Sequence, residues 1–121
     1  MIRDKLSTIQ KREKLNEVHR VGVKSYGGAY HNYAVVNAET KEILVAVEFQ
    51  EGPRKDPESR HGAIDSDLLE MVRDRLKCFQ SGGYACEENA QALRHFEEAL
   101  MWMIMRTENR FERGVLGTLA K

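Results

Sequence analysis

The sequence has little of what marks several large protein classes. Among its 121 residues there are two cysteines, Cys78 and Cys86, which are too few for a disulfide framework and fit a reducing cytoplasm. We expect both to behave as small hydrophobic residues. No apolar run reaches the ~18 residues of a membrane-spanning helix, and the amino-terminal stretch MIRDKLSTIQKREK is charged throughout, without an apolar signal core. These absences predict a soluble, cytoplasmic protein.

Motifs of catalysis and metal binding are also missing. The sequence contains no glycine-rich phosphate loop ahead of a helix, no paired-histidine metal motif and no Cys-x-x-Cys pair. The histidines are scattered, and we interpret them as surface or filling residues rather than as ligands: His19, His31, His61 and His95. We therefore predict no enzyme, no metal and no cofactor.

The chain has no net charge. Lys and Arg total 19, as do Asp and Glu, so the overall balance does not indicate a polyanion-binding protein. The charges are unevenly spread, because residues 1–29 carry seven basic and three acidic side chains, which leaves 12 basic and 16 acidic for the rest. A chain of this length has a modest core, and partner subunits are a plausible source of part of it.

The amino-terminal half predicts a small antiparallel sheet. Residues 1–29 show only an indistinct helical pattern, and we treat them as an appended, partly mobile segment before a main domain at residues 30–121. Residues 30–36 and 42–50 are rich in Tyr, Val, Ile and Phe, and the segment between them is turn-like. They predict a β-hairpin, followed by a basic, flexible loop that begins at Gly52-Pro53 and contains Arg54.

The carboxy-terminal half predicts two helices. Apolar residues recur at helical spacing from an N-cap at Asp65 or Ser66 until Ser81-Gly82-Gly83. A second helix begins near Cys86 and continues to Arg113, with Gly114 as the residue after its C-cap. The predicted fold class is therefore α+β, with a small amino-terminal sheet packed with a long carboxy-terminal helical hairpin.

The second helix is predicted to be much longer than the first. At 1.5 Å per residue the two helices measure ~42 Å and ~22 Å, so half of the second overhangs its partner. One face is predicted to pack on the first helix and on the β-hairpin; it contains Asn89, Leu93, Phe96, Leu100, Ile104, Thr107 and Phe111. The run from Met101 to Met105, with Trp102 inside it, is apolar all round and so requires burial all round. We predict a subunit interface there, or alternatively a cover formed by the amino-terminal segment.

Three arginines near the end of the second helix share one face. Arg106, Arg110 and Arg113 fall within about 60° of one another, whereas Glu108 and Glu112 project to the opposite side. Guanidinium groups match phosphate oxygens, so the row suits a pyrophosphate, and the following glycine turn would add backbone N–H donors and the Thr118 hydroxyl. The alternative is an ordinary basic helix end that offsets the helix dipole.

Several motifs, in order, resemble the phage Thoeris anti-defence sponge family. They are FQEGPRK at residues 49–55, LLEMVRDRLKCFQSG at 68–82, ENAQALRHFEEALMW at 88–102 and RTENRFERGVLGT at 106–118. The same helical hairpin occurs in the phage anti-CBASS cyclic-oligonucleotide sponges. The resemblance covers about residues 30–118.

The resemblance implies a protein that binds immune signalling nucleotides without cleaving them. The implied ligands are cyclic ADP-ribose isomers, and for some members cyclic dinucleotides or trinucleotides. The implied setting is a homo-oligomer, a dimer or a hexamer, in the cytoplasm of an infected bacterial host. The implied ligand-binding residues are Phe79 stacking on adenine, Asn89 as a polar contact, Arg106 and Arg110 at phosphate and Arg54 reaching from the sheet; Arg113 and Thr118 complete the candidate set.

Helix geometry limits which of these residues can contact the same ligand molecule. Asn89 and Arg106 are roughly 25 Å apart along one helix, which a single small ring cannot span, so we predict that they meet across two subunits. Each residue also has a structural interpretation: Phe79 as core, Asn89 as a partner of first-turn amides and Arg54 as a solvated loop residue. The rival functions are a nucleic-acid-binding module, a structural oligomer and an enzyme that hydrolyses the signal.

Overall fold

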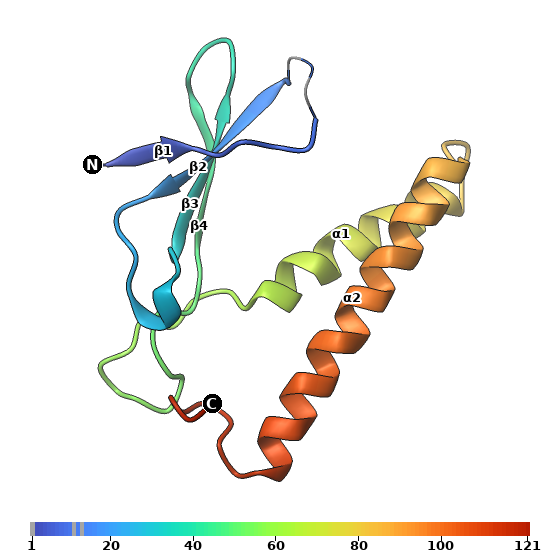
Figure 1. Ribbon diagram of the computed structural model, residues 1–121. Helices are drawn as coiled ribbons and strands as arrows, with labels where there is room; N and C mark the ends of the chain where they lie inside the picture. Colours follow the sequence, from blue (N-terminus) through green and yellow to red (C-terminus); the bar gives the residue numbers. More distant parts are fainter. Residues whose placement is uncertain (1, 11, 13) are drawn as a thin grey trace. The chain divides into compact units, whose positions relative to one another are not determined.

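The protein consists of a sheet followed by a helical hairpin (Figure 1). The computed structural model describes residues 2–10, 12 and 14–121. The strands are β1 (Arg3–Lys5), β2 (Asn16–Val21), β3 (Asn32–Asn37) and β4 (Ile43–Glu48), with a short 3₁₀ turn at Tyr26–Gly28 before β3. The helices are α1 (Asp65–Gln80) and α2 (Glu87–Glu112). The chain divides into two compact units, residues 1–63 and 64–121, which confirms a small sheet followed by a helical hairpin and places residues 1–29 in the first unit.

The sheet is antiparallel in the order β1-β2-β3-β4. The predicted hairpin is present as β3 and β4, and Asn37 shapes its turn by accepting hydrogen bonds from the amides of Glu39 and Thr40 at 2.9 and 3.0 Å. The helical pattern in residues 1–29 is wrong, because β2 pairs with β3 along its whole length. Pairing with a strand that contains β-branched residues stabilises the extended conformation more than a weak helical periodicity stabilises a helix.

The loop after β4 is tied to the sheet rather than flexible. Two isolated bridges, Phe49 with Ala63 and Glu51 with Arg60, return the chain beside the end of β4. The Arg60 guanidinium donates to the Phe49 carbonyl oxygen at 3.0 Å. At Gly62 a Cβ would lie 2.5 Å from the Glu48 carbonyl oxygen, so only glycine permits this close approach.

The start of α1 differs slightly from the prediction, whereas α2 begins where it was predicted. The N-cap of α1 is Ile64, one residue before the first of the two predicted positions, and the Asp67 carboxylate accepts its backbone N–H at 2.9 Å. The N-cap of α2 is Cys86, whose Sγ accepts the Asn89 amide at 3.4 Å. Both cysteines are exposed, so the prediction that they fill hydrophobic space is wrong. The predicted carboxy-terminal end is confirmed, because Gly114 has a φ of 71° directly after the C-cap.

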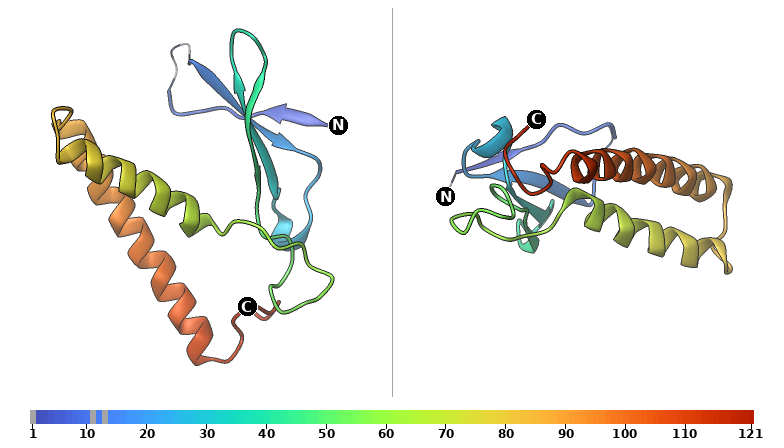
Figure 2. Two further views of the ribbon diagram at one scale, coloured as in Figure 1. Left: turned by 180° about the vertical axis from the view of Figure 1, so that it is seen from behind. Right: turned by 90° about the horizontal axis from the view of Figure 1, so that it is seen from below.

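The helices form an antiparallel hairpin, seen from behind and from below in Figure 2. The Arg73 guanidinium joins them by donating to Glu97 Oε2 at 2.9 Å, and this carboxylate raises the pKa of Arg73. Leu100 on the predicted packing face is buried, but Ile104 and Phe111 on the same face are exposed. This difference in burial follows from the lengths of the two helices, because α1 has 16 residues and α2 has 26.

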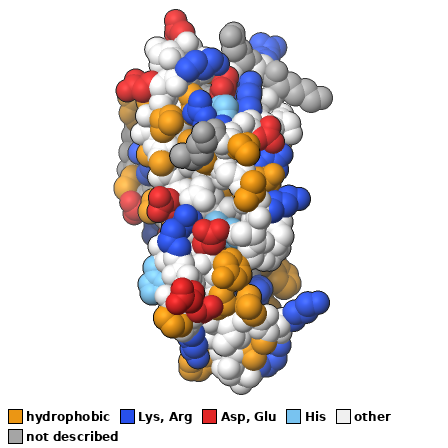
Figure 3. Space-filling view, turned by 90° about the vertical axis from the view of Figure 1, so that its left-hand side faces the viewer, with side chains coloured by type: hydrophobic (Ala, Val, Ile, Leu, Met, Phe, Trp, Pro, Cys, Tyr) orange, Lys and Arg blue, Asp and Glu red, His pale blue; other side chains and the backbone are white. Residues whose placement is uncertain are grey.

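The single chain leaves much apolar surface exposed. Its buried apolar core, within the described residues, is limited to Ala34, Val36 and Leu100. On α2, Met101, Trp102 and Met105 are exposed, and Trp102 retains 70% of its accessible surface. Hydrophobic side chains are visible between charged ones on the face drawn in Figure 3. Neither helix of the described chain is long and apolar enough to cross a membrane.

Candidate ligand-binding site

Phe79 and Asn89 lie near the closed end of the helical hairpin. Phe79 is in the last turn of α1 and Asn89 is in the first turn of α2, on either side of the connecting turn. The Phe79 ring is 38% exposed, and the Arg75 guanidinium carbon lies 5.3 Å from its centroid. In the single chain Phe79 is therefore partly exposed, with the Arg75 guanidinium over its ring.

The Asn89 side chain has no hydrogen-bond partner among the described residues. Its backbone amide bonds to Cys86 Sγ, but its carboxamide makes no hydrogen bond to any residue that the structure describes. The alternative that Asn89 serves the free amides of the first helical turn is therefore wrong, since Cys86 has that role. The carboxamide can offer both a donor and an acceptor to a ligand.

Arg106 faces a hollow of about 410 Å³ between the start of α1 and the last third of α2. Its guanidinium forms no hydrogen bond or ion pair within the described part of the chain. The first amides of α1 and the positive end of its dipole lie on the same hollow and favour an anion, whereas the Asp65 carboxylate opposes one. The lining residues are Ile64, Asp65, Ser66, Met103, Arg106 and Thr107.

Arg110 is buried, with 6% of its surface exposed. Its guanidinium donates to the carbonyl oxygens of Ala120 at 2.7 Å, Val115 at 3.0 Å and Thr118 at 3.0 Å. Arg110 is buried because the chain beyond α2 folds back over its guanidinium. Arg110 fixes the segment of residues 115–120 (the tail segment) against the end of α2.

Arg113 and Thr118 also take part in the tail segment's hydrogen bonds. Arg113 is the C-cap of α2, and its guanidinium donates to Asn109 Oδ1 at 2.9 Å and to the Lys121 carbonyl oxygen at 2.6 Å. The Thr118 hydroxyl bonds to the Val115 carbonyl oxygen and is exposed. The three arginines thus differ, since Arg106 is free and the other two are bonded to the main chain.

Arg54 belongs to the first compact unit, in the loop after β4. Its guanidinium donates to Gln50 Oε1 at 2.9 Å and to the Gly62 carbonyl oxygen at 3.4 Å. The residue is exposed but held in place, so it is not simply a solvated loop cation.

Two features of the structure were not predicted from the sequence. The burial of Arg110 depends on the tail segment folding back, and the only hint in the sequence is the pair Gly114 and Gly117, both at positive φ. A cluster of cations beside Glu17 was also missed, because its members come from separate segments. No group of three His, Cys, Asp or Glu side chains that can hold a metal occurs in the described residues.

Comparisons with known proteins match both units of the chain. The family described as Acb2/Tad1, hairpin domain, matches residues 41–108. Thoeris anti-defense 1 of Bacillus phage SBSphiJ7 is 40% identical over 96 residues, which are 79% of this chain and 67% of that protein.

Proposed function

The chain belongs to the Acb2/Tad1 hairpin-domain family, and from this premise we propose that it is a phage anti-Thoeris sponge that sequesters a signalling nucleotide. The proposed ligand is a cyclic ADP-ribose isomer, with cyclic dinucleotides and trinucleotides as further candidates. The ligand is held and later released unchanged. The place of action is the cytoplasm of the infected bacterium.

The observation that carries the proposal is the 40% identity to a Thoeris anti-defence protein, which extends over most of the chain. The free groups on the helical hairpin support it. Phe79 offers an exposed ring for the adenine, Asn89 an unbonded carboxamide and Arg106 an unbonded guanidinium for the pyrophosphate. Arg54 is proposed as a further contact.

The remaining candidates are proposed to act from the end of α2. Arg110 serves the site indirectly by fixing the tail segment, because its donors are already used by three carbonyl oxygens. Arg113 and the exposed Thr118 hydroxyl are the groups of that region with surface access, and they are candidates for a separate trinucleotide pocket.

We propose that the functional form is a homo-oligomer, a dimer or a hexamer, joined through the apolar surface of Met101, Trp102 and Met105. Asn89 and Arg106 lie roughly 25 Å apart along α2, so one small ring contacts both only when they come from different subunits. Fixing the site in an assembled oligomer reduces the ordering cost of binding.

A release experiment tests the proposal. The protein is incubated with a cyclic ADP-ribose isomer, separated from free ligand, heated and analysed for the released small molecule. Recovery of intact ligand supports a sponge. Recovery of a linear product would identify an enzyme, and the absence of any bound ligand would favour a nucleic-acid-binding or structural module.

A further inference from the structure

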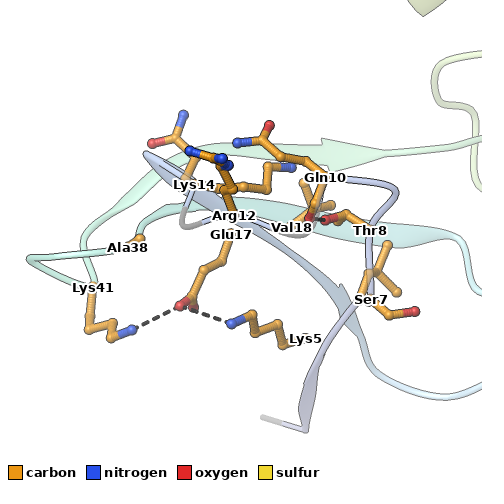
Figure 4. A pocket seen from close by; sticks show the side chains of 12 residues that line it. Lys5, Ser7, Thr8, Gln10, Arg12, Lys14, Glu17, Val18, Ala38 and Lys41 are labelled. Atoms are coloured by element: carbon orange, nitrogen blue, oxygen red, sulfur yellow. Dashed lines mark hydrogen bonds and ion pairs between the residues drawn. The ribbon is translucent and has the colours of Figure 1, made fainter.

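A second hollow, of about 410 Å³, lies in the sheet unit (Figure 4). It is lined by the end of β1, by described residues between positions 6 and 14, by the start of β2 and by the β3–β4 turn. Most of its lining precedes residue 41, where the hairpin-domain match begins. The lining residues are Lys5, Leu6, Ser7, Thr8, Gln10, Arg12, Lys14, Asn16, Glu17, Val18, Ala38 and Lys41.

The hollow is strongly basic. Of its described lining side chains four are cationic and one, Glu17, is anionic, in a chain whose total charge is zero. Glu17 Oε2 lies 3.0 Å from Lys41 Nζ and 3.5 Å from Lys5 Nζ. The hydrogen bond from Lys41, followed by that from His19, lowers the pKa of Glu17 to about 2, so the carboxylate stays ionised at neutral pH. One carboxylate therefore balances only one of two ammonium groups at the base of the hollow.

The other two cations have no ionic partner among the residues that the structure describes. They are Arg12 and Lys14, and Figure 4 shows them on the side away from the Lys5–Glu17–Lys41 cluster. The Ser7 hydroxyl is likewise without a hydrogen-bond partner among the residues described. The lining thus includes a guanidinium fork, an ammonium group and a hydroxyl donor, in addition to the Lys5–Glu17–Lys41 cluster.

We propose that this hollow binds a small phosphate-bearing molecule, with Arg12 and Lys14 on the phosphate oxygens and the Lys5–Glu17–Lys41 cluster adding one further positive charge to the lining. Guanidinium and ammonium groups are the side chains that recognise phosphate. The volume lies at the lower end of the range for small-molecule pockets. A local group of cations around one hollow, rather than an extended basic stripe, favours a small molecule over a nucleic-acid strand.

Nuclear magnetic resonance with inorganic pyrophosphate locates the binding. The full chain carrying Arg106→Ala is used, so that the proposed site on α2 is weakened. We expect amide shifts in residues 5–18 and 38–41, saturating below about 1 mM pyrophosphate, which corresponds to a modest binding free energy. Shifts confined to the helical hairpin, or none, would overturn the proposal. Loss of cyclic ADP-ribose uptake by this variant with these shifts retained would show that the two sites are separate.

Charge variants then test the assignment. Arg12→Ala with Lys14→Ala is expected to weaken pyrophosphate binding by about tenfold or more, as expected for the loss of two charge-assisted contacts. The matched control, Lys24→Ala with Lys55→Ala, removes two exposed lysines of the same unit outside the hollow and is expected to bind as the parent does. Equal affinity in both double variants would refute the site.

Glu17→Gln is expected to change pyrophosphate affinity in the opposite direction. Removing the one carboxylate leaves Lys5 and Lys41 unbalanced, so pyrophosphate affinity is expected to rise severalfold. A purely structural role for the cluster predicts no gain in pyrophosphate affinity. Unchanged or weaker pyrophosphate binding by a folded Glu17→Gln protein would contradict the proposal. Tighter binding of a single-stranded oligonucleotide than of pyrophosphate would likewise overturn the choice of a small ligand.

Discussion

At the scale of single residues, neighbouring arginines on one helix have different roles because of what folds back onto them. Arg106 and Arg110 are one turn apart on α2, yet the first guanidinium is free and the second donates to three carbonyl oxygens. A buried charge is tolerated only when its donors are used in this way. Substitution of these two residues therefore separates binding from stability.

Arg110→Ala is expected to destabilise the helical hairpin by about 2 kcal/mol, because it removes charged hydrogen bonds that hold the tail segment. The stability of wild type and variant is measured by urea denaturation, and hydrogen exchange is expected to accelerate at residues 115–120. Arg106→Ala is the control on the same helix and is expected to unfold as wild type does. Equal stability of the two variants would show that the Arg110 contacts contribute nothing.

Phe79→Ala is expected to weaken binding of a cyclic ADP-ribose isomer about ten- to a hundredfold, since stacking on an aromatic ring contributes roughly 1–3 kcal/mol per base. Calorimetry measures the affinity. Met71→Ala removes an exposed apolar side chain from the same helix and serves as the control. If the Phe79 variant binds normally, the adenine is held elsewhere.

At the scale of elements, Glu17 links separate segments of the sheet. It lies on β2, while its partners Lys5 and Lys41 lie on β1 and in the β3–β4 turn. The pKa of Glu17 is lowered from 4.5 to about 2, first by the hydrogen bond from Lys41. A lowered carboxylate pKa stabilises the folded state above the unfolded pKa, and this contribution is lost as pH falls towards the folded pKa.

The stability of wild type is therefore expected to fall between pH 4.5 and about 2 by more than that of Glu17→Gln, which lacks the titrating group. Urea denaturation at a series of pH values provides the test. Glu39→Gln, which removes an exposed carboxylate at the β3–β4 turn, is expected to follow wild type. A Glu17→Gln curve parallel to wild type throughout this range would remove Glu17 as the cause.

The elements that could be predicted from the sequence are those whose apolar residues recur at a regular spacing. The strands β3 and β4 and both helices follow from apolar spacing and glycine breaks, and Gly114 marks the end of α2. By contrast β1 and β2 were missed, because β1 has three residues and every residue of β2 is half-buried, so neither shows alternation. Burial of Arg110 depends on the tail segment folding back onto α2, which no local pattern encodes.

The same limit applies to the candidate site. Phe79 and Asn89 could be selected from the motifs. The structure shows a partly exposed Phe79 with Arg75 over its ring, and a half-buried Asn89 whose carboxamide bonds to no described residue. The arginine row could be selected from helical spacing, but spacing does not distinguish a free guanidinium from one used by the tail segment. The difference lies in the fold of residues 115–120, which is set by Arg110 itself.

At the scale of the whole molecule, the exposed apolar surface of α2 connects assembly to ligand binding. Trp102→Glu is expected to convert an oligomer to monomers and to abolish uptake of a cyclic ADP-ribose isomer, because a charge is disfavoured in an apolar interface. Light scattering after size-exclusion chromatography, with calorimetry on the same sample, measures both effects. Gln91→Glu places the same charge elsewhere on α2 as a control. A monomeric wild type, or a monomer that binds tightly, would refute the linkage.

A shared site makes a further prediction that a site within one chain does not. Asn89→Ala and Arg106→Ala are each expected to abolish tight binding, because each removes one side of the site. If Asn89 of one subunit and Arg106 of another hold the same ring, a mixed dimer of the two variants contains one intact site and one doubly defective site. Random exchange between equal amounts of the variants therefore restores about a quarter of all sites in a twofold-symmetric dimer.

The variants are unfolded together in urea, refolded together and titrated by calorimetry, with each variant refolded alone as the control. A stoichiometry of about one quarter of the wild-type value, at wild-type affinity, is the expected result because the restored sites are chemically complete. Separately refolded variants combined without exchange are expected to show no binding. Failure to restore any site after exchange, with mixed oligomers confirmed by two different affinity tags, would place Asn89 and Arg106 in separate sites and would remove the geometric reason for requiring an oligomer.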